Sequence, residues 1–360
     1  MFSLLSGTVN RIGFEGLGIA PFDVNRVAFT IGDFQVYWYG VIIAFGMLLA
    51  VLFSCAYSKK VGLKPDDILD GILYCLLPAL VGARLFYVVF ALDHYRTASG
   101  ALDFAAIVNV RDGGLAIYGG IIVGFLVGWL MCHFKRISML AMFDVVSIGF
   151  MIGQAVGRWG NFMNAEAYGY ETTLPWGMTI NGEGPYHPTF LYESLWNLLG
   201  IVLLLLLAKF DKKRNGETFL EYFIWYGAGR AVIEGLRTDS LWVFNAKTEE
   251  ALGFNLRISQ VIGIVFAVVG FVLLVLLRCG VFDSALAAAE ERRRVGREKD
   301  AARKAGKSAD YNPLFGEKET VSSQKETAEE EKQEPAATEG TQEEPEASPA
   351  KDESADGKEN

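Results

Sequence analysis

The sequence predicts an all-α integral membrane protein with about seven transmembrane helices, an N-terminus outside the cell, a cytoplasmic C-terminus and a disordered tail. About seven apolar stretches are long enough to cross a hydrocarbon core of roughly 30 Å as helices. Basic residues concentrate in alternate connecting segments, which fixes the orientation of such helices. The formal net charge is −9, yet residues 310–360 alone hold sixteen acidic and five basic residues. The chain is therefore an apolar membrane domain with an acidic appendage.

Residues 1–35 lack a basic segment followed by an apolar core, so they do not resemble a cleaved signal peptide. We interpret them as an interfacial N-terminal segment that precedes a transmembrane domain over residues 36–280. The second, fourth and sixth expected spans carry polar residues, which indicates that they line an interior, whereas the others are strongly apolar. The expected spans are approximately Val36–Tyr57, Asp67–Phe90, Leu115–His133, Met142–Phe162, Pro188–Lys209, Thr218–Leu236 and Ile258–Leu277.

Two polar segments follow the last expected span. Residues 281–309 form a basic juxtamembrane segment, and the Ala-rich stretch Asp283–Arg303 within it predicts a short helix with clustered arginines at 292–294. Residues 310–360 contain almost no large apolar side chains, so they cannot bury enough surface to offset their chain entropy. We expect this acidic tail to be disordered.

The orientation follows from the basic residues, which cluster on the cytoplasmic side of membrane proteins. One alternate set of connecting segments carries most of them, and the opposite set carries only scattered bases. Helices that run in opposite directions then bring their polar residues to one level, near the outer leaflet. The bases assigned to the cytoplasmic side are Lys59, Lys60, Lys64, Lys135, Arg136, Lys209, Lys212, Lys213, Arg214 and the cluster after Arg278.

A polar run closes the fourth expected span. Residues 157–169 read Gly-Arg-Trp-Gly-Asn-Phe-Met-Asn-Ala-Glu-Ala-Tyr-Gly. An uncompensated charge at bilayer depth costs at least about 3 kcal/mol, so such residues usually face a protein-lined, wet cavity. The run therefore predicts a functional site that contains Arg158, Asn161, Asn164 and Glu166.

The sixth expected span adds further charges. Arg230, Glu234 and Arg237 are spaced at i, i+4 and i+7, which places them on one face of a helix. By themselves they fit a structural ion-pair network as well as a ligand site. Together with Arg158, however, they supply more guanidiniums than local carboxylates, and planar guanidinium groups bind phosphate well. In a membrane the abundant phosphate belongs to lipid headgroups.

These motifs resemble the bacterial phosphatidylglycerol–prolipoprotein diacylglyceryl transferases. The polar run at 157–169 resembles the signature of that family, and other blocks match it in order over roughly residues 20–280. The supporting blocks are Trp38-Tyr39-Gly40, Gly82-Ala83-Arg84, Asp112–Gly120, His187-Pro188-Thr189 with Leu191-Tyr192-Glu193, and Tyr226–Arg230 with Glu234 and Arg237. The segment after residue 283 is not part of the resemblance.

The resemblance implies that the diacylglyceryl group of phosphatidylglycerol is transferred to the thiol of a lipobox cysteine in a prolipoprotein signal peptide. A thioether forms and glycerol phosphate leaves, in the first step of lipoprotein maturation. It further implies that Arg158 and Arg230 hold the lipid phosphate and that Glu234 and Arg237 order them. By the same resemblance, Asn161, Asn164 and Glu166 bind the headgroup glycerol or orient Arg158, and Tyr39 and His187 are further expected substrate-binding residues.

The general base is the open point of the resemblance. Some members carry a histidine where this chain has Tyr118, and a tyrosine with a pKa of about 10 is a poor base. Tyr118 is either ionised by nearby arginines, or it positions the thiol, or no single base is needed. We favour the positioning role. His187 is the remaining group that titrates near neutrality, although a His-Pro at a helix start is as often a structural cap.

Two other classes of protein remain as alternatives. A transporter or flippase of an anionic lipid would also need intramembrane arginines, and its mark would be broken helices near the midplane. A receptor or scaffold that signals through the acidic tail would leave the polar cavity unexplained. The spacing of the His and Cys residues predicts no metal site, and no cofactor or nucleic-acid partner is expected. The expected location is the bacterial plasma membrane, with the active site toward the outer leaflet and membrane lipids around the chain.

Overall fold

The computed structural model describes residues 9–96, 100, 102–109, 113–210, 214–238 and 257–304 of the 360-residue chain. The chain divides into two units, Met1–Arg297 and Glu298–Asn360, and the second is described only over residues 298–304, which end a helix. The predicted acidic tail at 310–360 lies outside the described residues. So do Asp112, Lys212 and Lys213.

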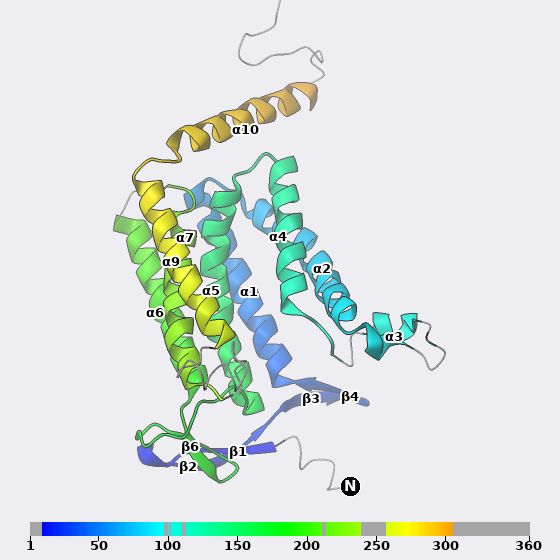
Figure 1. The fold of residues 1–360 in the computed structure, drawn as a ribbon, viewed down its shortest axis with the longest axis vertical. Coiled ribbons are helices and arrows are strands. Elements are labelled where there is room, and N and C mark those ends of the chain that lie inside the picture. Colours follow the sequence, from blue (N-terminus) through cyan, green and yellow to red (C-terminus); the bar gives the residue numbers. More distant parts are fainter. Residues whose placement is uncertain are drawn as a thin grey trace, which may run out of the picture. The chain divides into compact units, whose positions relative to one another are not determined.

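Long helices dominate the first unit (Figure 1). In the described part of the chain, six helices are long and apolar enough to cross a membrane. They agree with six of the seven spans that the sequence predicts, so the chain is a multi-pass membrane protein. These helices are α1 (Trp38–Ser58), α2 (Pro65–Phe90), α4 (Ile117–Phe134), α5 (Met139–Asn164), α6 (Thr189–Phe210) and α9 (Ile258–Arg278). Short helical segments are η1 (Glu15–Leu17), η2 (Lys59–Val61), η3 (Leu92–Tyr95) and α3 (Phe104–Val108).

The sixth expected span is formed by α7 (Glu217–Ile233), which continues into the 3₁₀ turn η4 (Glu234–Leu236). α7 packs against α9, α6 and α5. Its start is fixed by the buried Asp144 of α5, whose carboxylate accepts hydrogen bonds from the backbone N–H groups of Gly216 at 2.6 Å and Phe219 at 2.9 Å. These bonds satisfy donors that a helix N-terminus otherwise leaves unpaired.

Glycine pairs bring two pairs of helices into close backbone contact. Gly227 of α7 faces Gly263 of α9, and Gly82 of α2 faces Gly119 of α4. A methyl group added to any of these four glycines would collide with the carbonyl oxygen of its partner. Small residues at crossing points are the usual means by which helices associate where no hydrophobic effect drives them together. In this chain they align α7 with α9 and α2 with α4.

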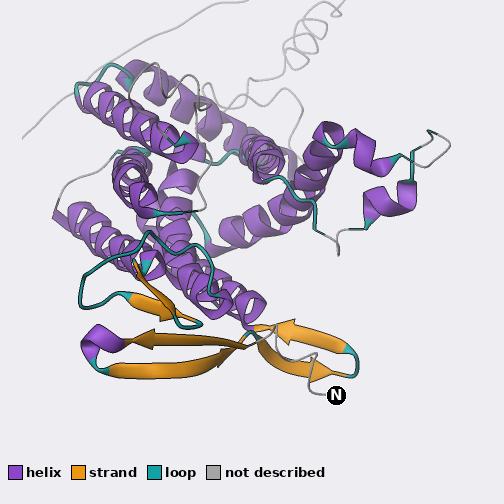
Figure 2. Cartoon of the chain, turned by 60° about the horizontal axis from the view of Figure 1, so that its bottom comes forward, coloured by secondary structure: helices purple, strands orange, loops and turns teal. Residues whose placement is uncertain are grey.

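A four-stranded antiparallel sheet lies at one end of the bundle (Figure 2). Its order is β2-β1-β5-β6, with β1 (Val9–Phe14), β2 (Ile19–Asn25), β5 (Met178–Ile180) and β6 (Glu183–Tyr186). Ile12 shows the register of β1 against both neighbouring strands, because it pairs with Phe22 of β2 and with Ile180 of β5. Its side chain is fully buried in a small core with Val24, Met178 and Phe190. The sheet thus joins the N-terminal segment to the connection between α5 and α6.

A separate hairpin, β3 (Val27–Ile31) and β4 (Phe34–Tyr37), leads directly into α1. Phe29, Ile31 and Phe34 of the hairpin are exposed, which suits a location at a membrane interface. The all-α prediction therefore describes the membrane-spanning part, and the outer segments add strands that it did not include. Residues 1–35 were predicted only as an interfacial segment, and the first span was expected to begin at Val36, whereas Val36 and Tyr37 end β4 and α1 begins at Trp38. The alternation in Phe34-Gln35-Val36-Tyr37 and the Gly32-Asp33 turn are the local signals of these strands.

The opposite end of the bundle carries α10 (Asp283–Lys304), the helix expected in the juxtamembrane segment. Its first part contacts two connecting segments of the bundle. Arg214 Nη1 donates to Asp283 Oδ1 at 2.7 Å and to the Leu277 carbonyl at 2.5 Å. Arg297 Nη1 donates to the Arg136 carbonyl at 2.9 Å. α10 therefore lies against the segments that the basic residues assign to the cytoplasm.

Candidate functional site

Three arginines converge on one carboxylate at the end of the bundle that carries the strands. Glu193, near the start of α6, lies with its Oε2 atom 2.5 Å from Nη2 of Arg158 and 3.5 Å from Nη1 of Arg230. Its Oε1 atom lies 3.6 Å from Nη1 of Arg237. The side chain of Glu193 is only 8% exposed. One buried carboxylate from α6 is thus shared by guanidiniums from α5, from α7 and from the segment that follows η4.

A second carboxylate completes this group. Glu234 is 4% exposed, and its Oε2 atom lies 2.7 Å from Nη2 of Arg230 across one helical turn. We call Arg158, Arg230, Arg237, Glu193 and Glu234 the arginine cluster. Three guanidiniums against two carboxylates leave the cluster with a net charge of +1. The three arginine side chains keep between 13% and 23% of their surface exposed, so an anionic ligand can reach their donors.

Glu193 is the member that the sequence analysis did not single out as a site residue. It belongs to the block that opens α6, and it is a carboxylate in an otherwise apolar membrane helix, which was the available signal. The contact between α6 and α7 that places it is supported about one turn further along α6 by stacked indoles. The Trp196 and Trp225 rings lie 4.3 Å apart, and each Nε1 donates to the other residue's carbonyl at 3.0 to 3.1 Å.

The polar run at the end of α5 forms a hydrogen-bonded chain. Arg158 Nη1 contacts Asn161 Oδ1 at 3.4 Å, and Asn161 Nδ2 donates to Glu166 Oε1 at 2.8 Å. Asn164 Nδ2 reaches the same Glu166 oxygen at 3.3 Å. Ala165 adopts a left-handed conformation, with φ of 51°, which ends α5 and turns Glu166 back toward both amides. The structure therefore brings together these four residues, which the sequence predicts as site residues.

Tyr39 and Arg26 connect the polar run to the hairpin. The Tyr39 ring packs on Gly160, where an added Cβ would lie 2.9 Å from a ring carbon. Arg26 Nη2 donates to the Asn164 carbonyl at 2.7 Å. Both residues line a cavity of about 570 Å³ that Asn164 and Glu166 also line. Tyr39 is thus placed beside the amides, as a residue that contacts a ligand there would be.

Tyr118 and His187 lie apart from these contacts. Tyr118 is in the first turn of α4, is 54% exposed, and has no hydrogen-bond partner among the described residues. His187 Nδ1 lies 3.2 Å from the Tyr192 hydroxyl, which accepts from Trp176 Nε1 at 2.7 Å. The His187 backbone also pairs with Gly169 and Tyr170. These bonds hold His187 in the segment that leads into α6.

Arg84 has a different role from the arginine cluster. Its guanidinium donates to five backbone carbonyls in the segment between α2 and α4, at 2.6 to 2.9 Å, and it lies over the Tyr95 ring. These contacts with protein carbonyls and a ring indicate that Arg84 orders this loop. The carbonyls belong to Ala106, Ile107, Asn109, Gly113 and Gly114.

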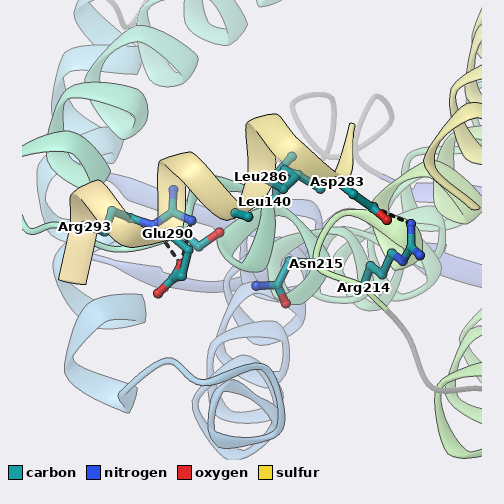
Figure 3. A pocket seen from close by; sticks show the side chains of 9 residues that line it. Leu140, Arg214, Asn215, Asp283, Leu286, Glu290 and Arg293 are labelled. Atoms are coloured by element: carbon teal, nitrogen blue, oxygen red, sulfur yellow. Dashed lines mark hydrogen bonds and ion pairs between the residues drawn. The ribbon is translucent and has the colours of Figure 1, made fainter. Parts of the chain in front are cut away.

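A second cavity, of about 440 Å³, lies at the other end of the bundle between α10 and the connecting segments (Figure 3). In Figure 3 its charged side chains point at each other, because Arg214 pairs with Asp283 and Arg293 pairs with Glu290 at 2.7 Å. This cavity offers no excess of donors comparable to that of the arginine cluster. Within the described residues, no group of three or more His, Cys, Asp or Glu side chains is placed to hold a metal ion.

Comparison with known proteins identifies the family. The family described as "Prolipoprotein diacylglyceryl transferase" matches residues 26–276. The chain is 43% identical over 249 residues to a phosphatidylglycerol–prolipoprotein diacylglyceryl transferase of Clostridioides difficile, covering 69% of this chain and 94% of that protein. Proteins of the same name from Enterococcus faecalis, at 43% over 267 residues, and Clostridium perfringens, at 40% over 265 residues, cover 71% of the chain and 91% and 95% of their own lengths. The chain that carries this arginine cluster therefore belongs to the prolipoprotein diacylglyceryl transferase family.

Proposed function

We propose that the arginine cluster is the place where this transferase moves the diacylglyceryl group of phosphatidylglycerol to the cysteine thiol of a prolipoprotein. The observation that carries the proposal is the convergence of three guanidiniums on the buried Glu193. Such a group holds more donors than its carboxylates use. It suits a phosphate diester that gains charge during the reaction.

The reaction balances around one carbon atom. The thiolate sulfur attacks the glycerol carbon of the diacylglyceryl group that bears the phosphate ester. The C–S bond forms, the C–O bond breaks, and glycerol phosphate leaves with the bonding electron pair. Because negative charge grows on the leaving oxygen, preorganised donors around the phosphate stabilise the transition state in a low-dielectric site.

Arg158 and Arg230 are the residues that bind this phosphate. Both contact Glu193 Oε2, at 2.5 and 3.5 Å, so their guanidiniums lie close together. A phosphate oxygen can bind to the N–H donors of these two guanidiniums that the carboxylate does not use. Glu234 and Arg237 hold the geometry, since Glu234 fixes the far side of Arg230 and Arg237 holds the other oxygen of Glu193. Asn161, Asn164 and Glu166 receive the headgroup glycerol, whose hydroxyls need both donors and acceptors.

The acceptor thiol has a pKa of about 8.5 in solution. Proximity to a cluster with an excess of guanidiniums favours its thiolate form. Tyr118 positions this thiol by one hydrogen bond and does not take its proton. Tyr118 is exposed and has no hydrogen-bond partner among the described residues, which is consistent with a hydroxyl that is available to a substrate. His187 supports the loop over the site through Tyr192.

The proposed topology places the site toward the outer leaflet of the bacterial plasma membrane. α7 with η4 crosses the membrane as the sixth of seven spans, the N-terminus is outside, and the C-terminus is cytoplasmic. In support of this topology, β1 pairs with β5, so the N-terminal segment and the α5–α6 connection share one side. Residues 1–35 then act as an outer segment, 36–280 as the catalytic membrane domain, 281–309 as a juxtamembrane segment and 310–360 as a cytoplasmic tail.

The test is lipidation by the purified protein. A peptide with a lipobox cysteine and phosphatidylglycerol should give a thioether-lipidated peptide, detected by its mass, and glycerol phosphate. Phosphatidylethanolamine should react far more slowly, because the cluster carries excess positive charge and the Asn161–Glu166 chain matches a glycerol diol. Equal turnover of both lipids would contradict the assignment of Asn161, Asn164 and Glu166. The alternative of an anionic-lipid transporter is not favoured by the family match.

A further inference from the structure

The cavity beside the polar run has one wall made of a strand edge. The whole of β4, Phe34–Tyr37, lines the cavity, and Asn164 and Glu166 form part of the facing wall. Tyr39 and Arg26 also contribute side chains to it. We call this cavity the outer groove. Since four consecutive strand residues line it, the groove runs beside the full length of β4, which is about 13 Å for a strand of this length.

The edge of β4 that faces away from β3 has no strand partner among the described residues, because the hairpin is a two-stranded sheet. Ile31 and Phe34 flank the two-residue turn and form one pair, and Thr30 pairs with Gln35 next. In a hairpin of this kind the pairs alternate between hydrogen-bonded and non-hydrogen-bonded, beginning with a bonded pair at the turn. The backbone N–H and C=O of Gln35 therefore point away from β3.

The two walls of the groove are fixed by contacts that do not use that edge. The Tyr37 hydroxyl donates to Gln35 Oε1 at 3.1 Å, which holds these two side chains on one face of β4. Arg26 Nη2 holds the Asn164 carbonyl at 2.7 Å, which ties the end of α5 to the start of the hairpin. An unpaired strand edge beside a preformed cavity is the arrangement that binds an extended peptide by adding a strand.

From this geometry we propose that the β4 side of the outer groove binds the extended main chain that follows the acceptor cysteine of the prolipoprotein, paired with the free edge of β4. Asn164 and Glu166, which line the groove from the end of α5, are left to the headgroup glycerol. Hydrogen bonds connect the groove to the arginine cluster, because Glu166 lines the groove and accepts from Asn161, which in turn contacts Arg158. The exposed Phe29, Ile31 and Phe34 hold the hairpin at the level where a signal peptide leaves the bilayer. The proposal rests on the proposed function, because it concerns the acceptor of that reaction.

The backbone pairing gives a sharp experiment. Two acceptor peptides are compared, one ending a single residue after the cysteine and one extended by five residues. With the unaltered protein, the extended peptide should have a KM roughly tenfold lower, the effect of one or two backbone hydrogen bonds. In Gln35→Pro, which removes the outward N–H and no bond to β3, that advantage should vanish while kcat on the short peptide is unchanged. The matched control, Gln35→Ala, keeps the N–H and should keep the advantage.

A second measurement does not depend on the folding of any variant. Extended peptides that are N-methylated at alternate positions lose backbone donors, and on the unaltered protein one of the two alternations should behave like the short peptide. A retained tenfold advantage in Gln35→Pro, or equal effects of both alternations, would overturn the proposal. A change in KM for phosphatidylglycerol instead would show that the groove holds the lipid. Failure to lipidate even the short peptide would count against the proposed function itself. The test therefore separates failure of the proposed function from failure of the proposed peptide groove.

Discussion

Glu193 is the residue on which the three guanidiniums of the site converge. If it is replaced by Gln, the shape is kept, but the cluster changes from two carboxylates to one and its net charge rises to +2. Removing one partner of a buried ion pair commonly costs about 3–5 kcal/mol, because the other charge is left uncompensated. We expect Glu193→Gln to lower both the melting temperature in detergent and kcat. Glu166→Gln, which alters an exposed carboxylate, should leave the melting temperature nearly unchanged, and an equal drop in both variants would contradict this reasoning.

Arg158 and Arg230 test the demand for planar donors. Arg158→Lys and Arg230→Lys keep the charge, but an ammonium cannot hold two oxygens in the geometry of a guanidinium. Loss of preorganised donors at a developing charge costs about 10²- to 10³-fold in kcat. We expect both variants to fall in this range in the lipidation assay. Arg96→Lys, at an exposed position, is the control, and near-normal turnover of either site variant would reduce that arginine to a general counter-charge.

Tyr118 distinguishes positioning from proton transfer. Tyr118→Phe removes only the hydroxyl, and loss of one hydrogen bond of about 1 kcal/mol should lower kcat/KM roughly fivefold to tenfold. The loss should shrink as pH rises, since more of the acceptor thiol is then thiolate. Loss of a general base would instead cost about 10²- to 10⁴-fold. An inactive Tyr118→Phe variant at every pH, with unimpaired lipid binding, would therefore identify Tyr118 as the base. Tyr118→His should stay at least partly active.

Individual residues differ in how far the sequence could predict them. Arg158, Asn161, Asn164 and Glu166 were expected together because they are close in sequence at the end of one apolar span. Glu193 was not expected in the cluster, because it is 35 residues or more from each arginine that it contacts and only the packing of α6 on α5 and α7 brings them together. Arg84 belongs to a block that supported the family resemblance, but its bonds to five backbone carbonyls show that it orders the loop between α2 and α4.

The crossing of α7 and α9 governs where Arg230 lies. Gly227 and Gly263 meet at this crossing, and either one substituted by Leu would push the helices apart. We expect Gly227→Leu to lower the melting temperature and to reduce lipidation sharply, since Arg230 is three residues further along α7. Gly153→Ala is the control, because an added Cβ there meets nothing within 4 Å and Ala favours the helix. A Gly227→Leu variant with unchanged melting and turnover would show that the crossing is adaptable.

α10 lies beyond the part of the chain that matches the family, which ends at residue 276. A chain that stops after residue 304 should match the full chain in melting temperature and turnover. A chain that stops after Phe282 loses the contacts of Asp283 with Arg214 and of Arg297 with the Arg136 carbonyl. We expect it to melt a few degrees lower but to keep its turnover, because the arginine cluster is at the other end of the bundle. Loss of turnover with an unchanged melting temperature would mean that α10 acts on the reaction.

The strands show where prediction from sequence stops at the scale of elements. Transmembrane helices can be recognised by their length and apolar composition alone, and six of seven expected spans meet both criteria in the structure. The strands are three to seven residues long, and β1 pairs with β5 across more than 160 residues. Strands that pair across so many residues produce no local pattern in the sequence that would predict the pairing. The register at Ile12 depends on a small core that forms only when the α5–α6 connection is present.

At the scale of the whole molecule, the structure combines two different kinds of support for one site. On one side are helices aligned by glycine contacts, which determine where the arginines lie. On the other are strands that bring Arg26 and Tyr39 beside Asn164. The basic residues alone predicted which end of the molecule would carry the site. They could not predict that the N-terminal segment would contribute a wall to it.

The pairing of β1 with β5 has a consequence for how the protein is made. β1 precedes α1 in the chain, yet its neighbour in the sheet begins at Met178, after α5. During synthesis β1 therefore has no β5 to pair with until the four long helices α1, α2, α4 and α5 have been made. A chain arrested before residue 178 has an incomplete outer sheet and lacks Glu193. Completion of the end that carries the arginine cluster is in this sense a late event of synthesis.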